Sequence, residues 1–202
     1  KASGKWIREN FKKPFYAHIA GEYFRSLETA AKLGIPDARW VPSIYLRPRD
    51  FGSLSNLDSP LSSQEYKEHM SEKARDSFYW TPPNGESIAH LSLRTERVIH
   101  WISQHVPPEE TALIVTHKDI METFRIQIEK ISQLDYTKMI VQCPPEQQIH
   151  HCSILHFTRR NPLTGEVIPT YGWMRVVTPW MGRKFTDNEF VAIVKKRYGN
   201  EE

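Results

Sequence analysis

His117 stands where a catalytic or ligand-binding group is commonly found in α/β proteins. It directly follows the unbroken apolar run TALIVT (111–116), which predicts a buried strand, and it precedes a predicted helix over 119–134. Ligands in α/β folds bind beyond the carboxyl ends of strands, and the free N–H groups of a helix N-terminus attract anions. His117 is therefore a candidate for a phosphate site. A histidine that is merely hydrogen-bonded at a strand end fits this stretch equally well.

Three arginines have a similar placement. Arg25 lies between a predicted strand over 15–24 and a predicted helix that Gly34 ends, while Arg47 and Arg49 lie on a loop after a short strand over 38–46. A guanidinium can bind a phosphate group through two parallel hydrogen bonds. The alternatives are an ordinary surface arginine at position 25 and a solvated loop at 47–50.

These residues need elements to position them, and the sequence alternates strands with helices. Further helices are predicted over 1–13, 62–74, 87–106 and 187–197, and a hairpin over 153–177 joins two strands through the turn NPLTGE. This alternation predicts an α/β fold in layers, with helices on both faces of a sheet.

Composition excludes several classes of protein. The 202 residues are 39% apolar, enough for one core, and no apolar run approaches the roughly 18 residues of a membrane span, so we expect a soluble chain. The net charge is +3 and the basic residues are interspersed with acidic ones, which argues against nucleic-acid binding. Cys143 and Cys152 make no disulfide framework, which favours a reducing intracellular compartment, cytoplasm or organelle matrix. With His150 and His151 they fit no common zinc spacing, so we expect no metal.

Four stretches carry a resemblance to a known family. GEYFRSLETAAKLGIPDARW, YLRPRDFGSL, PPNGESIAHLSLR and IVTHKDIMETFR occur in the order and spacing of the histidine phosphatase superfamily, in its phosphoglycerate-mutase-like branch. The resemblance implies a three-layer α/β/α fold with a mainly parallel sheet. It also implies phosphoryl transfer through a phosphohistidine, without metal or other cofactor, on a phosphorylated small molecule.

The resemblance assigns roles to particular residues. His117 matches the family's second histidine, Arg25 its second phosphate-binding arginine, and Arg49 a substrate-contacting arginine, with Arg47 beside it. Glu86, in Gly-Glu-Ser, matches a glutamate at the edge of the family's pocket. The resemblance gives it a supporting role or that of a possible proton-donating acid.

Departures from the family pattern surround the same pocket. No Arg-His-Gly, the motif with the nucleophilic histidine, occurs in the 202 residues. Pro48 occupies the position of the proton-donating glutamate, Lys118 that of a glycine, and Gly21 that of a serine. Lys118 could still help to hold an anion. We therefore expect a catalytically degenerate domain that serves as a structural or anion-binding subunit, with a protein partner or larger assembly. The alternative is an active phosphatase or phosphomutase whose nucleophile precedes Lys1, with Glu86 or Asp50 as the acid.

The amino-terminal end leads to one further expectation. The chain begins at Lys1, and its first residues already have the pattern of an amphipathic helix. We therefore expect residues 1–202 to form one phosphoglycerate-mutase-like domain that lacks its first strand. We expect this domain to end in a hairpin and a helix over about 153–202. Loss of a central strand leaves buried backbone groups unpaired. We therefore expect upstream residues or a partner to complete the sheet.

Overall fold

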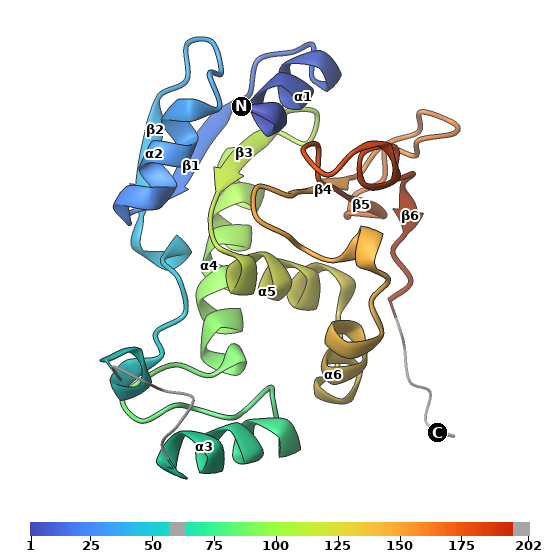
Figure 1. Cartoon of the computed structure of the whole chain (residues 1–202). Helices are drawn as coiled ribbons and strands as arrows, with labels where there is room; N and C mark the ends of the chain where they lie inside the picture. The colour runs from blue at the N-terminus through green and yellow to red at the C-terminus, as the bar shows by residue number, and fades with distance from the viewer. Residues whose placement is uncertain (57–63, 196–202) are drawn as a thin grey trace, which may run out of the picture.

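The structure, a computed structural model, describes residues 1–56 and 64–195 and has an α/β architecture (Figure 1). The helices within these residues are α1 (Ala2–Asn10), α2 (Phe24–Lys32), α3 (Gln64–Arg75), α4 (Ile88–His105), α5 (Lys118–Glu129) and α6 (Gln133–Gln142). The strands are β1 (Ala17–Gly21), β2 (Trp40–Ser43), β3 (Ala112–Val115), β4 (Ile154–Thr158), β5 (Trp173–Val177) and β6 (Val191–Ala192). No helix among these residues has both the length and the apolar character needed to cross a bilayer.

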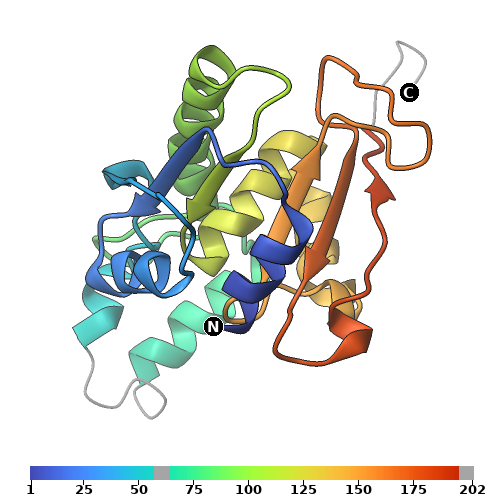
Figure 2. The same cartoon turned by 90° about the horizontal axis from the view of Figure 1, so that it is seen from above.

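The strands form two sheets of three. The first has the order β2-β1-β3 and is parallel, with Ile19 of β1 opposite Val41 of β2 and Ile114 of β3. The second has the order β4-β5-β6 and is antiparallel. In the view from above, β4 and β5 stand beside the parallel sheet, and α1 lies across the region between the two (Figure 2). The parallel sheet with its helices confirms the predicted α/β class.

Apolar side chains pack on both faces of the sheets. On one face, Trp6 and Ile7 of α1 and Ala30 of α2 join Val115 of β3 and Val177 of β5 in one buried cluster. On the opposite face a second cluster joins β1 with α4, α5 and α6. Helices therefore cover the sheets from both sides, as the layered prediction required.

Local signals explain where several elements begin and end. The hydroxyl of Ser87 accepts from the backbone N–H of His90, and the backbone N–H of Ser87 donates to the ring of His90, so α4 opens on a reciprocal cap. This helix ends at Val106, directly before Pro107, as predicted. Gly34 follows α2 with a φ of 63°, the left-handed conformation that glycine adopts without strain.

Two predicted helices differ from the structure. The helix expected over 119–134 is divided, because Lys130 takes a left-handed φ of 57° and ends α5 before α6 begins. The helix expected over 187–197 is wrong: within the described residues this segment contains the short strand β6, which pairs with Trp173 and Met174 of β5, and residues 196–202 lie outside them. The free edge of β5 offers backbone partners there, and local sequence periodicity does not reveal such an edge.

Candidate functional site

A pocket lies at the carboxyl ends of β1 and β3. Tyr23 is the N-cap of α2, shortly after β1, and His117 is the N-cap of α5, shortly after β3. The pocket has a volume of about 450 Å³, and Arg25, Lys118 and His117 line it. Two helix N-termini face the same region, and their dipoles favour a negatively charged ligand. Three of the predicted site residues are therefore brought together where the sequence placed them.

His117 is half-buried and hydrogen-bonded. Its Nε2 atom lies 2.9 Å from the hydroxyl of Ser26 on α2. Burial, followed by the positive charges of Arg25 and Arg94, lowers its pKa from 6.5 to about 4. The imidazole is therefore neutral at pH 7 and offers one donor and one acceptor rather than a positive charge. Sequence reasoning missed Ser26, because nothing in the sequence marks a helix hydroxyl that meets a residue 91 positions away.

Arg25 and Lys118, two of the three cationic residues that line the pocket, differ in how firmly they are held. The guanidinium of Arg25 lies 5.0 Å from the ring centroid of Tyr23, and this side chain is exposed. The ammonium of Lys118 lies 3.7 Å from Glu122 one helical turn along α5. Neither arrangement uses all the donors of the cation, so both can contact an anion in the pocket.

Arg49 also lines the pocket, but its guanidinium is tied to the surrounding chain. It is only 7% exposed, its Nε donates to the carbonyl of Glu86 at 2.7 Å, and its Nη2 donates to the carbonyl of Trp80 at 3.1 Å. It also stacks at 5.1 and 5.3 Å from the rings of Phe51 and Trp80. Burial lowers its pKa. These contacts tie the loop that carries Arg49 to the segment that precedes α4. They also leave the side chain of Arg49 less free to move toward a ligand than that of Arg25.

Glu86 is engaged in a buried ion-pair network and is not among the residues that line the pocket. Its Oε1 accepts from Arg47 at 3.2 Å, while its Oε2 accepts from Arg94 at 2.9 Å and from the backbone N–H of Asp50 at 3.1 Å. These three contacts tie the carboxylate to Arg94 of α4 and to the loop that carries Arg47 and Asp50. The Arg47 guanidinium is directed toward Glu86, and Arg47, like Glu86, is not among the residues that line the pocket.

Arg94 is a further site residue that sequence reasoning did not assign. Its guanidinium donates to the carbonyls of Tyr45, Arg47 and Pro48 at 3.0–3.3 Å, in addition to Glu86. It therefore fixes the loop that carries the pocket residues Pro48 and Arg49. Glu86 precedes α4 and lies eight residues from Arg94, outside the i,i+4 spacing of ion pairs on one helix, so no local signal marks this pair.

The structure gives a physical reason for one departure from the family pattern. A Cβ atom at Gly21 would lie 2.7 Å from the carbonyl oxygen of Leu46. The backbone of the Arg47 loop thus approaches β1 too closely for a serine at this position. Pro48 lines the pocket and offers no side-chain proton there.

A buried acidic group behind the pocket was also missed. Glu122 on α5 is 7% exposed, and burial, followed by the charge of Asp119, raises its pKa from 4.5 to about 7. Burial likewise raises the pKa of Tyr136, which is hydrogen-bonded to Glu122. Asp119 and Lys118 connect this pair to the pocket wall. Within residues 1–56 and 64–195, no three His, Cys, Asp or Glu side chains come together as metal ligands.

Comparison with known proteins gives a family match over most of the chain. The model of the histidine phosphatase superfamily (branch 1) matches residues 2–162. The 2,3-bisphosphoglycerate-dependent phosphoglycerate mutase of Bartonella bacilliformis is 30% identical over 98 residues, which cover 48% of this chain and 48% of that protein. The enzyme of the same description from Bartonella tribocorum is 26% identical over 136 residues, covering 65% and 66%. The chain thus spans between half and two thirds of the length of these curated relatives.

Solved structures with the same fold are more distant in sequence. Bacillus stearothermophilus YhfR superposes with a TM-score of 0.58 at 20% identity, over 82% of this chain and 78% of that one. A mycobacterial glucosyl-3-phosphoglycerate phosphatase superposes with a TM-score of 0.55 at 15% identity, over 68% of each chain. The same mycobacterial protein has also been solved with inorganic phosphate.

Proposed function

The chain belongs to the histidine phosphatase superfamily, branch 1, and from that premise we propose that it is a catalytically degenerate phosphoglycerate-mutase-like domain that binds a phosphate-like anion without turning it over. The observation that carries the proposal is the make-up of one pocket: Arg25, His117 and Lys118 line it together with Pro48, the residue to which the resemblance assigns the position of the acid. Such a domain acts as an anion-binding or structural subunit.

The cationic groups favour phosphate as the ligand. Arg25 offers a planar fork of N–H donors, Lys118 adds a point charge, and the N-termini of α2 and α5 contribute their dipoles. A phosphorylated small molecule or free phosphate fits this set. Turnover needs more than binding, because phosphate monoesters are among the slowest substrates to hydrolyse without a nucleophile and an acid.

Binding of inorganic phosphate to the purified protein at pH 7.5, followed by calorimetry at fixed ionic strength, tests the first half of the proposal. Arg25→Met should raise the Kd at least ~10-fold, because it removes a charge-assisted hydrogen bond worth about 1.5–3 kcal/mol. Arg39→Met is the matched control: this exposed arginine precedes β2 at the opposite, amino end of the strands and should leave the Kd within about twofold. Equal effects of the two variants would reject the pocket as the binding site.

Release of phosphate from p-nitrophenyl phosphate tests the second half. We expect no release above the blank. Release that His117→Asn abolishes would contradict the proposed degeneracy.

The second candidate is a working phosphatase or mutase whose nucleophilic histidine precedes Lys1. The co-location of Arg25 and His117 in one pocket favours it, because these are the groups that would hold a transferring phosphoryl group. Acid-labile ³²P incorporation into the longest natural form of the polypeptide would decide for this candidate. Its absence across a broad panel of phosphomonoesters would decide for the degenerate domain.

A further inference from the structure

The pocket lined by Arg25, His117 and Lys118 is larger than a phosphate group. Its volume is about 450 Å³, which is the room of roughly 15 water molecules at about 30 Å³ each. Phosphate consists of one phosphorus atom and its oxygens, and it fills only part of this space. The pocket therefore has room for an organic part of the ligand beside the phosphate, and its remaining walls indicate the chemistry of that part.

The wall next to the cationic groups is aromatic and apolar. Tyr23, Pro48 and Phe51 line it. The ring of Tyr23 lies 5.0 Å from the guanidinium of Arg25, and its centroid lies 6.2 Å from that of the His117 ring, which meets it edge-on. Because the Tyr23 side chain is still 45% exposed, part of its ring is open to a ligand directly beside the groups that hold the phosphate.

Phe51 adds a second ring to this wall. The guanidinium of Arg49 lies 5.1 Å from its centroid, and Pro48 on the same loop offers a third apolar surface without a side-chain donor. An aromatic ligand can stack on such rings or meet them edge-on. A glycerol or sugar chain would instead place hydroxyl groups against a wall that gives them few partners. The wall therefore favours an aromatic over a polyhydroxylated organic part.

The charges of the pocket favour one anionic group on the ligand rather than two. Among the described residues that line it there are three cations and two carboxylates, Arg25, Arg49, Lys118, Asp50 and Asp119. Arg49 already donates to two backbone carbonyls. A second phosphate or a carboxylate on the ligand would have to lie near Asp50 or Asp119, and like charges at close range repel. The organic part is therefore uncharged.

We propose that the ligand of this pocket is an aryl phosphate, a small molecule whose phosphate is attached directly to an uncharged aromatic ring. This inference rests on the proposed function, which places the phosphate at Arg25, His117 and Lys118. Direct attachment follows from the position of Tyr23, whose ring adjoins both Arg25 and His117. A nucleotide would hold its base further from the phosphate, across a ribose.

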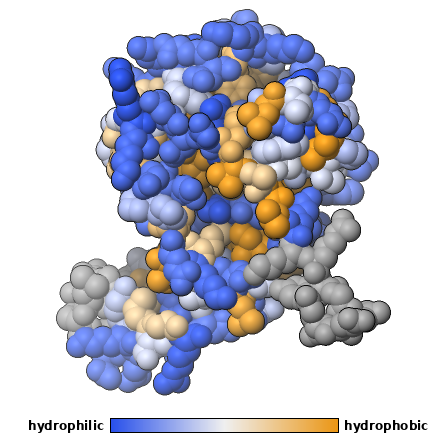
Figure 3. Space-filling view, turned by 90° about the vertical axis from the view of Figure 1, so that its right-hand side faces the viewer, coloured by the Kyte–Doolittle hydropathy of each residue, from blue (hydrophilic) through white to orange (hydrophobic). Residues whose placement is uncertain are grey.

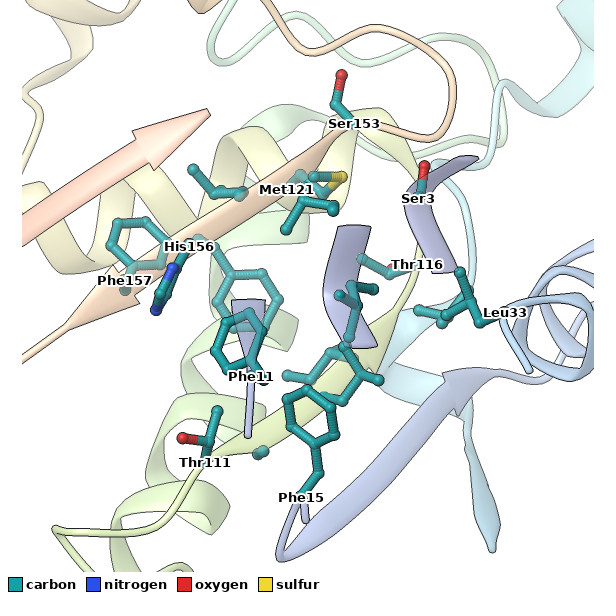
Figure 4. A pocket seen from close by; sticks show the side chains of 18 of the residues that line it. Ser3, Phe11, Phe15, Leu33, Thr111, Thr116, Met121, Ser153, His156 and Phe157 are labelled. Atoms are coloured by element: carbon teal, nitrogen blue, oxygen red, sulfur yellow. The ribbon is translucent and has the colours of Figure 1, made fainter. Parts of the chain in front are cut away.

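Two other surfaces compare less well with the needs of such a ligand. The cavity between the two sheets has a volume of about 970 Å³ and includes the same three phosphate-facing residues in its lining. Phe11, Met121 and Phe157 point into it (Figure 4), and its size favours a flexible alkyl chain over a single ring. The face over β4–β6 and α6 shows only small clusters of apolar side chains among polar ones (Figure 3), and none of the described residues of these elements lines the smaller pocket.

Calorimetry with matched phosphate esters tests the proposal. Phenyl phosphate, hexyl phosphate, glycerol 3-phosphate, 3-phosphoglycerate and AMP are compared at pH 7.5 and fixed ionic strength. We expect phenyl phosphate to bind at least ~10-fold more tightly than each of the others. Equal affinity for phenyl phosphate and glycerol 3-phosphate overturns the proposal. Tighter binding of 3-phosphoglycerate, of AMP or of hexyl phosphate than of phenyl phosphate also overturns it, since these results would indicate a second anion subsite, a distant ring or occupation of the large cavity.

A substitution at Tyr23 locates the ring of the ligand. Tyr23→Leu keeps an apolar side chain but removes the aromatic face, so phenyl phosphate should bind at least ~5-fold more weakly while the Kd of inorganic phosphate changes less than about twofold. Tyr16→Leu is the matched control, because Tyr16 is 56% exposed and precedes β1 at the opposite end of the strand from the pocket. It should leave both Kd values within about twofold. Equal losses for the two ligands in Tyr23→Leu would mean that this ring only positions Arg25, which contradicts the proposal.

The affinity for inorganic phosphate separates this inference from the proposed function. If inorganic phosphate binds and its binding depends on Arg25, but the phenyl ester gains nothing over the glycerol ester, the anion site stands and the aryl ligand is wrong. If neither inorganic phosphate nor any of the esters binds, the proposed function is wrong and the aryl ligand is wrong with it.

Discussion

At the scale of single residues, the site combines groups whose ionisation is set by burial. His117 is held neutral, with a pKa of about 4, while Glu122 has its pKa raised to about 7. Desolvation is the largest cause in both cases, since it disfavours the charged form of each group. The positive charge of the pocket at neutral pH therefore comes from Arg25, Arg49 and Lys118 and not from the imidazole.

Glu122 gives a prediction about pH and stability. The carboxyl group of Glu122 has a pKa of 4.5 in the unfolded chain and about 7 in the folded one. Between these pH values the folded protein binds more protons than the unfolded chain. The free energy of unfolding therefore falls as pH rises from about 4.5 to 7. Glu122→Gln removes this penalty. We expect the variant to be more stable than the parent by up to about 3 kcal/mol above pH 7, with the difference shrinking to near zero below pH 4.

Urea unfolding at pH 4, 6 and 8 measures this effect. Glu129→Gln is the control on the same helix, because Glu129 is ion-paired with Arg125 at 2.7 Å and its loss should not stabilise the protein at any of these pH values. A Glu122→Gln variant that is less stable than the parent at pH 8 would show that the ion pair with Lys118 outweighs desolvation.

At the scale of elements, residues 45–50, which follow β2, are held in position by Arg94 of α4. Arg94 donates to three loop carbonyls and to Glu86, and Glu86 in turn accepts from Arg47 and from the backbone of Asp50. The loop carries Pro48 and Arg49 into the pocket. Arg94 of α4 thus adds to the contacts that Arg49 itself makes in fixing this wall of the pocket.

Arg94→Met should weaken the contacts that hold the pocket residues Pro48 and Arg49 in position. The change leaves Glu86 without its closer cationic partner and three carbonyls without a donor, so we expect a loss of about 2–4 kcal/mol in the free energy of unfolding. Phosphate affinity should fall with it, because Arg49 and Pro48 lose their fixed position.

Arg97→Met is the matched control for this change. Arg97 is an exposed arginine on the same helix whose only described contact is with the ring of Tyr45 at 5.8 Å, and its loss should cost less than about 1 kcal/mol. Chemical denaturation compares both variants with the parent. Equal stabilities for the two would mean that the network is not needed to hold the loop.

At the scale of the whole molecule, the two sheets share one apolar core. Val177 of β5 is fully buried in the cluster that also contains Trp6 and Ile7 of α1 and Val115 of β3. Because α1 packs against both sheets, we propose that residues 1–202 behave as one domain and unfold as one cooperative unit.

Val177→Ala tests whether the chain unfolds as one cooperative unit. Removing two buried methyl groups should cost about 2 kcal/mol and should shift the unfolding curves from far-UV circular dichroism and tryptophan fluorescence together. Val194→Ala is the control, since Val194 is 82% exposed and its truncation should change stability by less than about 0.5 kcal/mol. Separate transitions for the two probes would instead assign the two sheets to independent units.

The sequence by itself determined the class of fold, the family and the position of most of the pocket. Apolar periodicity and turn signals located α4 and the β4–β5 hairpin, because these elements form from contacts between residues close in the chain, and an unbroken apolar run located the buried strand β3. Arg25 and His117 each follow a strand signal, and because these two strands, β1 and β3, are neighbours in the parallel sheet, their carboxyl ends meet at one pocket.

Only the tertiary structure decided what depends on residues far apart in the chain. It showed that Arg49 and Glu86 are committed to loop contacts, that Ser26 meets His117, and that Glu122 is buried enough to change its pKa. It replaced the final predicted helix with β6, because the free edge of β5 offered a partner. It also placed the open edges of β3 and β4 across one cavity, since strand order is set by packing and not by any local pattern.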